Sequence, residues 1–321
     1  LGRLSFDPNS GRLKQIHCGD RDLLASSPQL NVWRAPTDND GLKAWIGNED
    51  KSLSNLISVS TLSRWLKAGL DQIRLTKERC SVSEVFTRRD SSAESGQKQP
   101  GLTNLEQNLE RSLLHIEVEQ CYSCGPISEA FVHHTIWHVF PDLSLWMENM
   151  VMVHEELNDL PRIGISFQIQ EGFEEFEWFG NGPHESYCDR MAGVRVGRFH
   201  STVNEQYVPY IVPQEHGNKT GLRWIILKDV NCSGLFISGS GLFEGSVSHY
   251  PDAHLYSTSH AYKLQSHPET SVYLDYRQRG LGTGSCGPDT LERYLIPSGI
   301  HHFDYVFRPF DPRKTDPEEL F

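Results

Sequence analysis

Three glycines near the end of the chain have a spacing that could serve phosphate chemistry. In RQRGLGTGSCGPDTL, residues 277–291, Gly282, Gly284 and Gly287 match the pattern G-x-G-x-x-G. A strand-like run, SVYLDYRQ, leads into them. In dinucleotide-binding proteins such glycines let the backbone approach a pyrophosphate where a helix begins. The spacing alone therefore raises the hypothesis of a nucleotide site.

The context of these glycines argues against that hypothesis. The dinucleotide fingerprint opens a β-α-β unit, so a helix and further parallel strands must follow it. Here Pro288 and Asp289 follow the last glycine, and the chain soon returns to a strand-like pattern. A phosphate loop would need Gly-Lys-Ser/Thr, which does not follow either. Two interpretations remain: a turn that needs positive φ angles, or a loop that lets a ligand or another domain come close.

Cysteine and histidine spacing raises a second chemistry, metal binding. Cys121 and Cys124 are the only close pair among seven cysteines. A structural zinc site needs a second pair of ligands, and no partner pair lies at a usual distance. His133 and His134 follow, but HHTIWHVF reads as a strand. The sequence therefore favours free thiols and predicts no metal site in this chain.

The elements that must position these residues are mostly strands. RIGISFQIQ, residues 162–170, alternates apolar and polar side chains as a strand does, and many other stretches share this pattern. Helical patterns are few: SVSTLSRWLKAGL (58–70) and HLYSTSHAYKLQ (254–265). The β-α alternation of a doubly wound sheet is missing. The pattern predicts a mainly β, large antiparallel protein of two packed sheets, with one or two short helices.

Length and composition fit a globular protein. We expect residues 1–321 to form a single domain, with an exposed, disordered insertion at the polar stretch 87–112. The formal net charge of −12 argues against nucleic acid as a partner. No apolar run approaches the roughly 18 residues that cross a bilayer, so we expect no membrane partner.

The first residues suggest a piece of a longer protein. The chain begins without Met and opens directly into a strand-like pattern, LGRLSFDPNSGRLKQI. It shows no signal-peptide pattern. The compartment is not determined by the sequence, with the cytoplasm favoured.

Four longer stretches carry distinctive motifs: NVWRAPTDND (31–40), WFGNGPHESYCDR (178–190), VPYIVPQEHGNKTGLRW (208–224) and DYRQRGLGTGSCGPDT (275–290). In this order they resemble the C-terminal domain of the large β-galactosidases of glycoside hydrolase family 2, also called the β-galactosidase small chain. The resemblance extends from about Gly2 to Pro309. It implies an antiparallel β-supersandwich similar in fold to galactose mutarotase.

The resemblance also implies a function. The complete enzyme would hydrolyse terminal β-D-galactose from β-galactosides by a retaining mechanism, which uses two carboxylates about 5–5.5 Å apart. In the family both carboxylates come from a (β/α)₈ barrel, so no catalytic residue is expected in this chain. The family's magnesium and sodium sites also lie mostly outside this domain, so no cofactor is expected here. The implied partners are the barrel and other domains of the same enzyme and the β-galactoside, and a homo-oligomer is left open.

What the domain supplies, by the same resemblance, is one wall at the mouth of the sugar site. In relatives a tryptophan of the glycine-rich loop stacks on the sugar, and Cys286 takes its place in this chain. A mobile loop is implied at residues 41–50. The predicted edge of the sugar site comprises Gly284, Ser285, Cys286, Asp40, Gly41 and Trp45.

Further polar side chains in the four stretches have two interpretations. They could hold sugar hydroxyls, or they could be polar groups that tie loops together. The candidates for sugar contacts are Arg34, Asp38, His184, Glu185 and His216.

Two other functions are compatible with such a fold. A free-standing aldose epimerase would need a His and a Glu that converge in one open cleft as general acid and base. A carbohydrate-binding module would need an exposed aromatic platform. The position of the histidines, glutamates and aromatic side chains therefore discriminates among the three functions.

Overall fold

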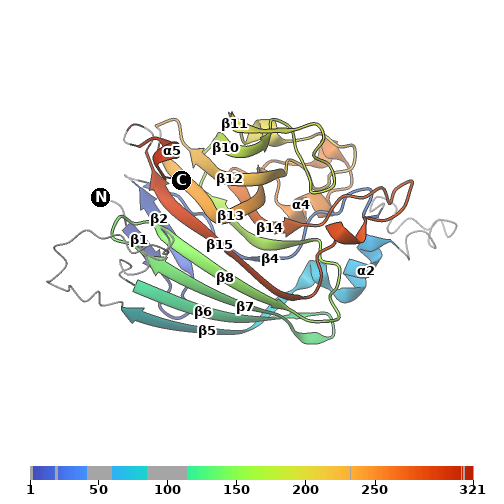
Figure 1. Ribbon diagram of the computed structural model, residues 1–321, viewed down its shortest axis with the longest axis horizontal. Helices are drawn as coiled ribbons and strands as arrows, with labels where there is room; N and C mark the ends of the chain where they lie inside the picture. Colours follow the sequence, from blue (N-terminus) through green and yellow to red (C-terminus); the bar gives the residue numbers. More distant parts are fainter. Residues whose placement is uncertain are drawn as a thin grey trace, which may run out of the picture.

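The structure of this chain is a computed structural model that describes residues 3–18, 21–41, 60–84, 114–231, 233–311, 313 and 315–320. These residues form fifteen strands and three α-helices (Figure 1). Every pairing between the strands is antiparallel. The predicted fold class, a mainly β antiparallel protein with few short helices, is confirmed.

The strands belong to two sheets. A small sheet contains β1 (Arg3–Phe6), β2 (Leu13–Cys18) and β3 (Arg21–Asp22). The large sheet contains β4 (Gln29–Asn31), β5 (Arg74–Glu84), β6 (Leu114–Cys124), β7 (Ile127–Val139), β8 (Leu145–Val153), β9 (Arg162–Ile169), β10 (Glu175–Gly182), β11 (Arg195–Thr202), β12 (Lys219–Lys228), β13 (Gly234–Ser248), β14 (Thr270–Gln278) and β15 (Gly299–Phe310). Its main path is β11-β10-β12-β13-β15-β8-β7-β6-β5. A branch continues from β13 through β14 and β9 to β4.

β13 joins the two parts of the large sheet. Residues 234–238 pair with both β12 and β15, whereas residues 244–248 pair with β14. Gly239 and Gly241 lie between these two halves. Because one long strand serves both parts, the two packed sheets expected from the sequence are instead one curled and branched sheet, whose curvature Figure 1 shows.

The strands form where alternating apolar residues predict them. In β9, Ile163, Ile165, Phe167 and Ile169 are all at most 2% exposed and belong to the main hydrophobic core. Trp137, Trp178 and Trp224 are buried as well. Burying large apolar side chains in this way is the main favourable contribution to folding.

The first described helix, α2 (Thr61–Ala68), follows its local sequence closely. The Ser60 hydroxyl accepts a hydrogen bond from the Ser63 amide at the start, and Gly69 ends the helix with a φ of +83°. Leu62 and Trp65 are buried on one face, as the pattern predicts.

The other helical segments are shorter. They are α4 (Asp252–Ser257), α5 (Pro317–Leu320) and the 3₁₀ turns Leu70–Gln72, Asn204–Gln206, Ala261–Lys263 and Glu292–Tyr294. The helix expected at 254–265 is therefore split into α4 and a 3₁₀ turn. In Figure 1, α2 and α4 lie at the same end of the molecule.

Some predictions fall on residues that the structure does not describe. The insertion at 87–112 lies outside the described residues, and so does the loop at 41–50 apart from Gly41. Trp45 belongs to that undescribed part. That residues 1–321 form a single domain stays a prediction.

Candidate functional site

Segments from all four quoted stretches meet at one end of the sheet. Residues 34–41 follow β4, and residues 280–290, the glycine loop, follow β14. The Asn39 side-chain amide donates to the carbonyl of Gly282 at 2.9 Å and accepts from the amide and hydroxyl of Ser285 at 3.2 and 2.7 Å. From the second stretch, the Asp189 carboxylate accepts from the backbone amides of Leu281 and Gly282. The glycine loop is therefore held from two sides.

The glycines of this loop serve backbone shape and close approach. Gly282 has a φ of +64°, which favours glycine. A Cβ on Gly284 would lie 2.4 Å from the backbone oxygen of Asn39. The group that comes close to Gly284 is thus another loop of the same chain, which the sequence did not indicate. A 3₁₀ turn and then β15 follow the loop, as the strand-like pattern predicts.

The tip of the glycine loop is open to solvent. Gly284, Ser285 and Cys286 are exposed, and Cys286 is a free cysteine. The amides of Cys286 and Gly287 both donate to the carbonyl of Thr283, at 3.0 and 2.7 Å. Three of the predicted sugar-edge residues therefore lie on a surface that a ligand or another domain can reach.

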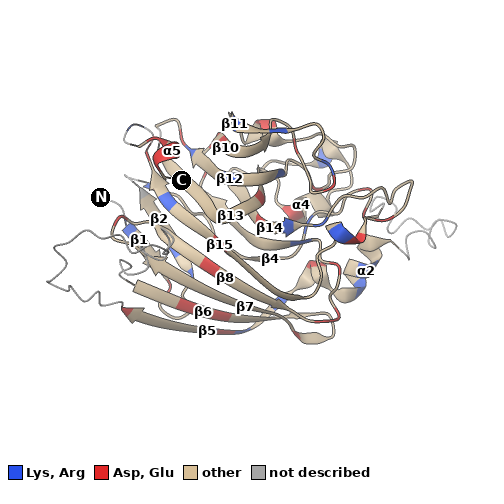
Figure 2. Cartoon of the chain, in the orientation of Figure 1, with Lys and Arg blue, Asp and Glu red and all other residues tan. Residues whose placement is uncertain are grey.

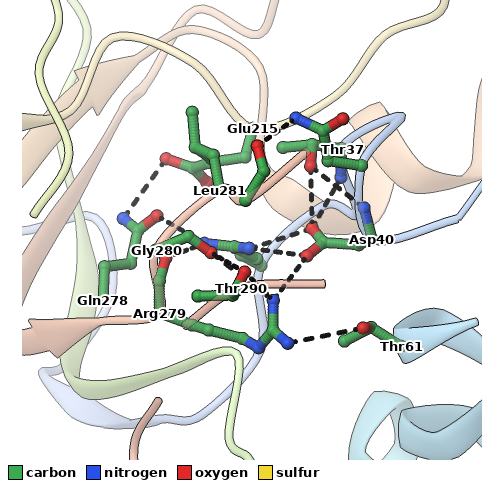
Figure 3. Close-up of polar contacts among 12 residues, drawn as sticks. Thr37, Asp40, Thr61, Glu215, Gln278, Arg279, Gly280, Leu281 and Thr290 are labelled. Carbon is green, nitrogen blue, oxygen red and sulfur yellow. Dashed lines mark hydrogen bonds and ion pairs between the residues drawn. The ribbon is translucent and has the colours of Figure 1, made fainter. Parts of the chain in front are cut away.

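Arg34 and Asp40 occupy the opposite environment, at 0% exposure each. Two guanidinium nitrogens of Arg34 donate to Asp40 at 3.2 and 2.7 Å, and a third reaches the carbonyl of Arg279 at 2.5 Å. Asp40 also accepts from the amide and hydroxyl of Thr37 (Figure 3). Asp40, expected at the edge of the sugar site, and Arg34, a candidate sugar contact, are therefore both enclosed. They tie the 34–41 turn to Gln278 and Arg279, just before the glycine loop.

The remaining predicted contacts divide between surface and interior. Asp38 is exposed and exchanges hydrogen bonds with Gln214, and His184 is exposed too. His216 is 6% exposed, and its Nδ1 lies 2.9 Å from the carbonyl of Gln214. Gly41 is partly buried. Asp38 and His184 remain candidates for ligand contact on geometry, whereas His216 is packed within the chain.

Glu185 is a loop tie with a perturbed carboxyl group. It accepts hydrogen bonds from the Tyr210 hydroxyl at 2.6 Å and the Gly217 amide at 2.8 Å, and it pairs with Arg190. Burial by itself would raise the pKa of Glu185, but these donors outweigh burial and hold the pKa below its usual value. Glu185 is therefore held as a carboxylate that joins the second and third quoted stretches.

Beneath these loops lies a group of charges that the sequence did not reveal. Arg162 is 0% exposed and faces three carboxylates: Glu215 at 2.6 Å, Asp252 at 3.3 Å and Asp275 at 3.6 Å. We call these four residues the interior cluster. Burial raises the pKa of both Asp252 and Asp275 to about 7, against the opposing charge of Arg162. The one sequence signal was an aspartate within the otherwise apolar run SVYLDY.

Gln278 connects the interior cluster to the loops above it. Its side-chain amide donates to Glu215 and Asp275 at 3.4 and 3.3 Å, and its oxygen accepts from Arg34. Figure 3 shows Gln278 and Arg279 extending from adjacent backbone positions, with Arg279 reaching towards Thr61. The site therefore consists of an exposed loop tip on a buried polar scaffold.

The geometry weakens both alternative functions. Glu215 and His216 are 4% and 6% exposed, so this pair does not face an open cleft as an epimerase would require. Among the described residues, the large exposed side chains include one aromatic, Tyr262, which is too little for a platform.

The described residues contain neither a metal-binding cluster nor a membrane-spanning helix. Among them, no group of three or more His, Cys, Asp or Glu is placed to hold a metal ion. Cys121 and Cys124 are buried free thiols, and burial raises the pKa of Cys124 to about 11. Within the part of the chain that is described, no helix has the length and apolarity to cross a membrane.

Architecture and site together define a large antiparallel β structure with a loop cluster at one end. The family model described as β-galactosidase small chain matches residues 2–308. The chain belongs to this family, as the four stretches predicted.

The curated relatives are β-galactosidases. The chain is 27% identical to one from Priestia megaterium over 91% of its length, 28% identical to one from Actinobacillus pleuropneumoniae over 95%, and 30% identical to one from Staphylococcus xylosus over 94%. It spans about a quarter of these relatives, 24%, 26% and 26% of their lengths.

One solved structure with a more distant likeness is a putative epimerase. A putative aldose 1-epimerase from Escherichia coli K12 covers 97% of this chain and 96% of its own, with 10% identity and a TM-score of 0.41. A likeness at this level carries no argument about function.

Proposed function

We propose that this chain is a non-catalytic part of a retaining β-galactosidase that releases terminal β-D-galactose from β-galactosides. The paired carboxylates of that reaction come from other domains of the enzyme. Family membership over nearly the whole chain supports the proposal, and so does the chain's share of about a quarter of its relatives. By the same proposal this chain holds no cofactor, and the magnesium and sodium sites of the complete enzyme lie mostly in those other domains.

The glycine loop forms one wall of the sugar site in this proposal. The observation that carries it is the exposed tip Gly284–Cys286, held in place by Asn39 and Asp189 from distant parts of the chain. A loop that is both exposed and rigidly anchored is suited to shape a binding site. Cys286 lies on the side of the second sugar, the leaving group of the reaction.

A thiol at this position contributes less than an aromatic ring would. Stacking on an indole adds about 0.5–1.5 kcal/mol beyond area burial, which corresponds to about a two- to tenfold change in affinity. In the full-length enzyme, Cys286→Trp should therefore strengthen inhibition by glucose as a second-site ligand by that factor. The kcat/KM for simple aryl galactosides should change little.

The matched control is Cys286→Ala, which removes the thiol without adding a ring and should shift glucose inhibition less. If Cys286→Trp folds normally and leaves the glucose inhibition constant unchanged, the loop does not border the second sugar.

A further inference from the structure

Four charged side chains beside the glycine loop form a closed ring of ion pairs. Arg279 lies 2.6 Å from Asp159 and 2.8 Å from Asp289. Arg64 lies 3.0 Å from Asp159 and 2.9 Å from Asp289. Each arginine thus contacts both carboxylates. We call Arg64, Asp159, Arg279 and Asp289 the rim ring.

The rim ring joins three parts of the chain that are far apart in the sequence. Arg64 belongs to α2, Asp159 to the connection between β8 and β9, Arg279 follows β14, and Asp289 ends the glycine loop. In Figure 2 the long strands are mostly tan, whereas basic and acidic segments occur together at the end that holds α2. The Thr61 hydroxyl adds hydrogen bonds to Asp289 at 3.2 and 3.3 Å.

The four side chains of the rim ring differ in exposure, from buried Arg279 through partly buried Asp159 to exposed Arg64 and Asp289. The Arg279 side chain is 1% exposed, whereas those of Arg64 and Asp289 are 47% and 46% exposed. Burial by itself would raise the pKa of Asp289, but hydrogen bonds from Arg279 and Arg64 hold it below its usual value. Asp289 therefore stays ionised and holds the end of the loop by charge.

Asp289 anchors the end of the loop beyond Cys286, beside Thr290, whose hydroxyl accepts from Arg279 at 2.7 Å and donates to the Gly280 carbonyl at 3.1 Å. Asn39 and Asp189 hold residues 281–285, whereas Asp289 lies three residues beyond Cys286. Without Asp289, Arg279 would keep Asp159 at 2.6 Å and Asp40 at 3.7 Å. Neutralising Asp289 thus leaves no buried charge unpaired, and the fold should survive while the loop loses one anchor.

We propose that Asp289 is a positioning residue: through Arg64 and Arg279, it fixes the far end of the glycine loop and thereby the place of Cys286 at the second sugar. The effect on sugar binding rests on the proposed function of the loop. The effect of Asp289 on the position of the loop does not rest on that proposed function.

The test is Asp289→Asn in the full-length enzyme, with Glu292→Gln as the matched control. Glu292 is an exposed carboxylate three residues further on. Hydrogen exchange of peptides covering residues 281–290 reports the hold on the loop without any sugar. Inhibition by glucose, against kcat for an aryl galactoside, reports the consequence at the second sugar.

We expect Asp289→Asn to speed exchange in the loop and to weaken glucose inhibition by about two- to fivefold, the usual range for a partly exposed ion pair. The kcat for the aryl galactoside should stay within about twofold. Glu292→Gln should change neither quantity. Asp289→Glu, which keeps the charge, should restore most of the slow loop exchange and most of the glucose inhibition.

The outcomes separate the two proposals. Unchanged loop exchange in Asp289→Asn overturns the positioning role. Faster exchange with unchanged glucose inhibition supports the role of Asp289 in positioning the loop. It overturns the proposal that the loop borders the second sugar. If Asp289→Asn does not fold, Arg64→Gln removes the exposed arm of the rim ring, and unchanged loop exchange there overturns the proposal.

Discussion

Two buried arginines of this chain meet carboxylates in opposite surroundings. In the interior cluster, Arg162 faces acids such as Asp275 that are as buried as the arginine itself, and burial raises the pKa of Asp275 to about 7. In the rim ring, Arg279 faces Asp289, whose side chain is 46% exposed and whose pKa is lowered by its arginine partners despite partial burial. The same pair of residue types thus gives a buried carboxyl group that binds a proton more readily in one place, and a carboxylate that stays ionised in the other.

The first test of the difference between the two regions is to replace one arginine in each. Arg162→Gln leaves three buried carboxylates without their cation, which should cost about 3–5 kcal/mol of unfolding free energy. Arg64→Gln, on the open side of the rim ring, should cost less than about 1 kcal/mol. Urea unfolding of both variants measures the difference. Equal losses would mean that the two regions are not energetically distinct.

The second prediction concerns pH. The pKa of Asp275 rises from 3.8 to about 7 on folding, so between these values the folded state holds a proton that the unfolded state has lost. This contribution to stability is fully present below about pH 4 and is lost as the pH rises through about 7, a change of about 2–4 kcal/mol. In Asp275→Asn, the Tm should vary less with pH over this range than in the parent protein. If Tm depends on pH equally in Asp275→Asn and in the parent protein, a group other than Asp275 takes up the proton.

The third prediction concerns the glycine loop on the rim. Gly284→Ala puts a Cβ 2.4 Å from the backbone oxygen of Asn39, which cannot move as a flexible side chain can. The cost should be about 1–3 kcal/mol, as for other overpacked sites. Gly193→Ala is the control, because a Cβ there meets nothing within 4 Å. The Tm of Gly284→Ala is compared with that of Gly193→Ala. Similar values would show that the fold does not require a residue without Cβ at position 284.

The smallest predicted effect is the response of the two regions to salt. The Debye length falls from about 10 Å at 0.1 M to about 3 Å at 1 M, which screens exposed pairs far more than buried ones. The loss of stability in Asp289→Asn should therefore shrink at high salt, whereas the loss in Arg162→Gln should persist. Denaturant titrations at both salt concentrations test this, and a salt-independent loss in Asp289→Asn would contradict an exposed ion pair.

Much of the scaffold was predictable because its signals are local. Alternating apolar residues mark β9, and Ser60 and Gly69 mark the ends of α2. Of the two interpretations of the glycine loop, a positive φ is found at Gly282, whereas the group that comes close to Gly284 is the backbone of Asn39 and not a ligand or another domain. The contact between Asn39 and the glycine loop was not predictable. Asn39 lies more than 240 residues away in the sequence, and no local pattern around it indicates its partner.

The charged scaffold was not predictable for a related reason. In the sequence, Arg162 is a polar residue at the start of one apolar run and Asp275 is a polar residue within another. Only the pairing of β14 with β9, with Asp275 opposite Gly164, brings their charges together in the interior. Arg34 and Asp40 were equally ambiguous, since the same residue types suit a sugar site and a buried turn.

The most direct test of the proposed function is the reactivity of Cys286 in the full-length enzyme. Iodoacetamide labelling is followed at each cysteine by mass spectrometry, with and without a non-hydrolysable galactosyl-glucoside at ten times its Kd. If the glycine loop borders the sugar site, the ligand should slow labelling of Cys286 by about tenfold and leave partly buried Cys80 on β5 unchanged. Equal labelling of Cys286 with and without the ligand would contradict the account.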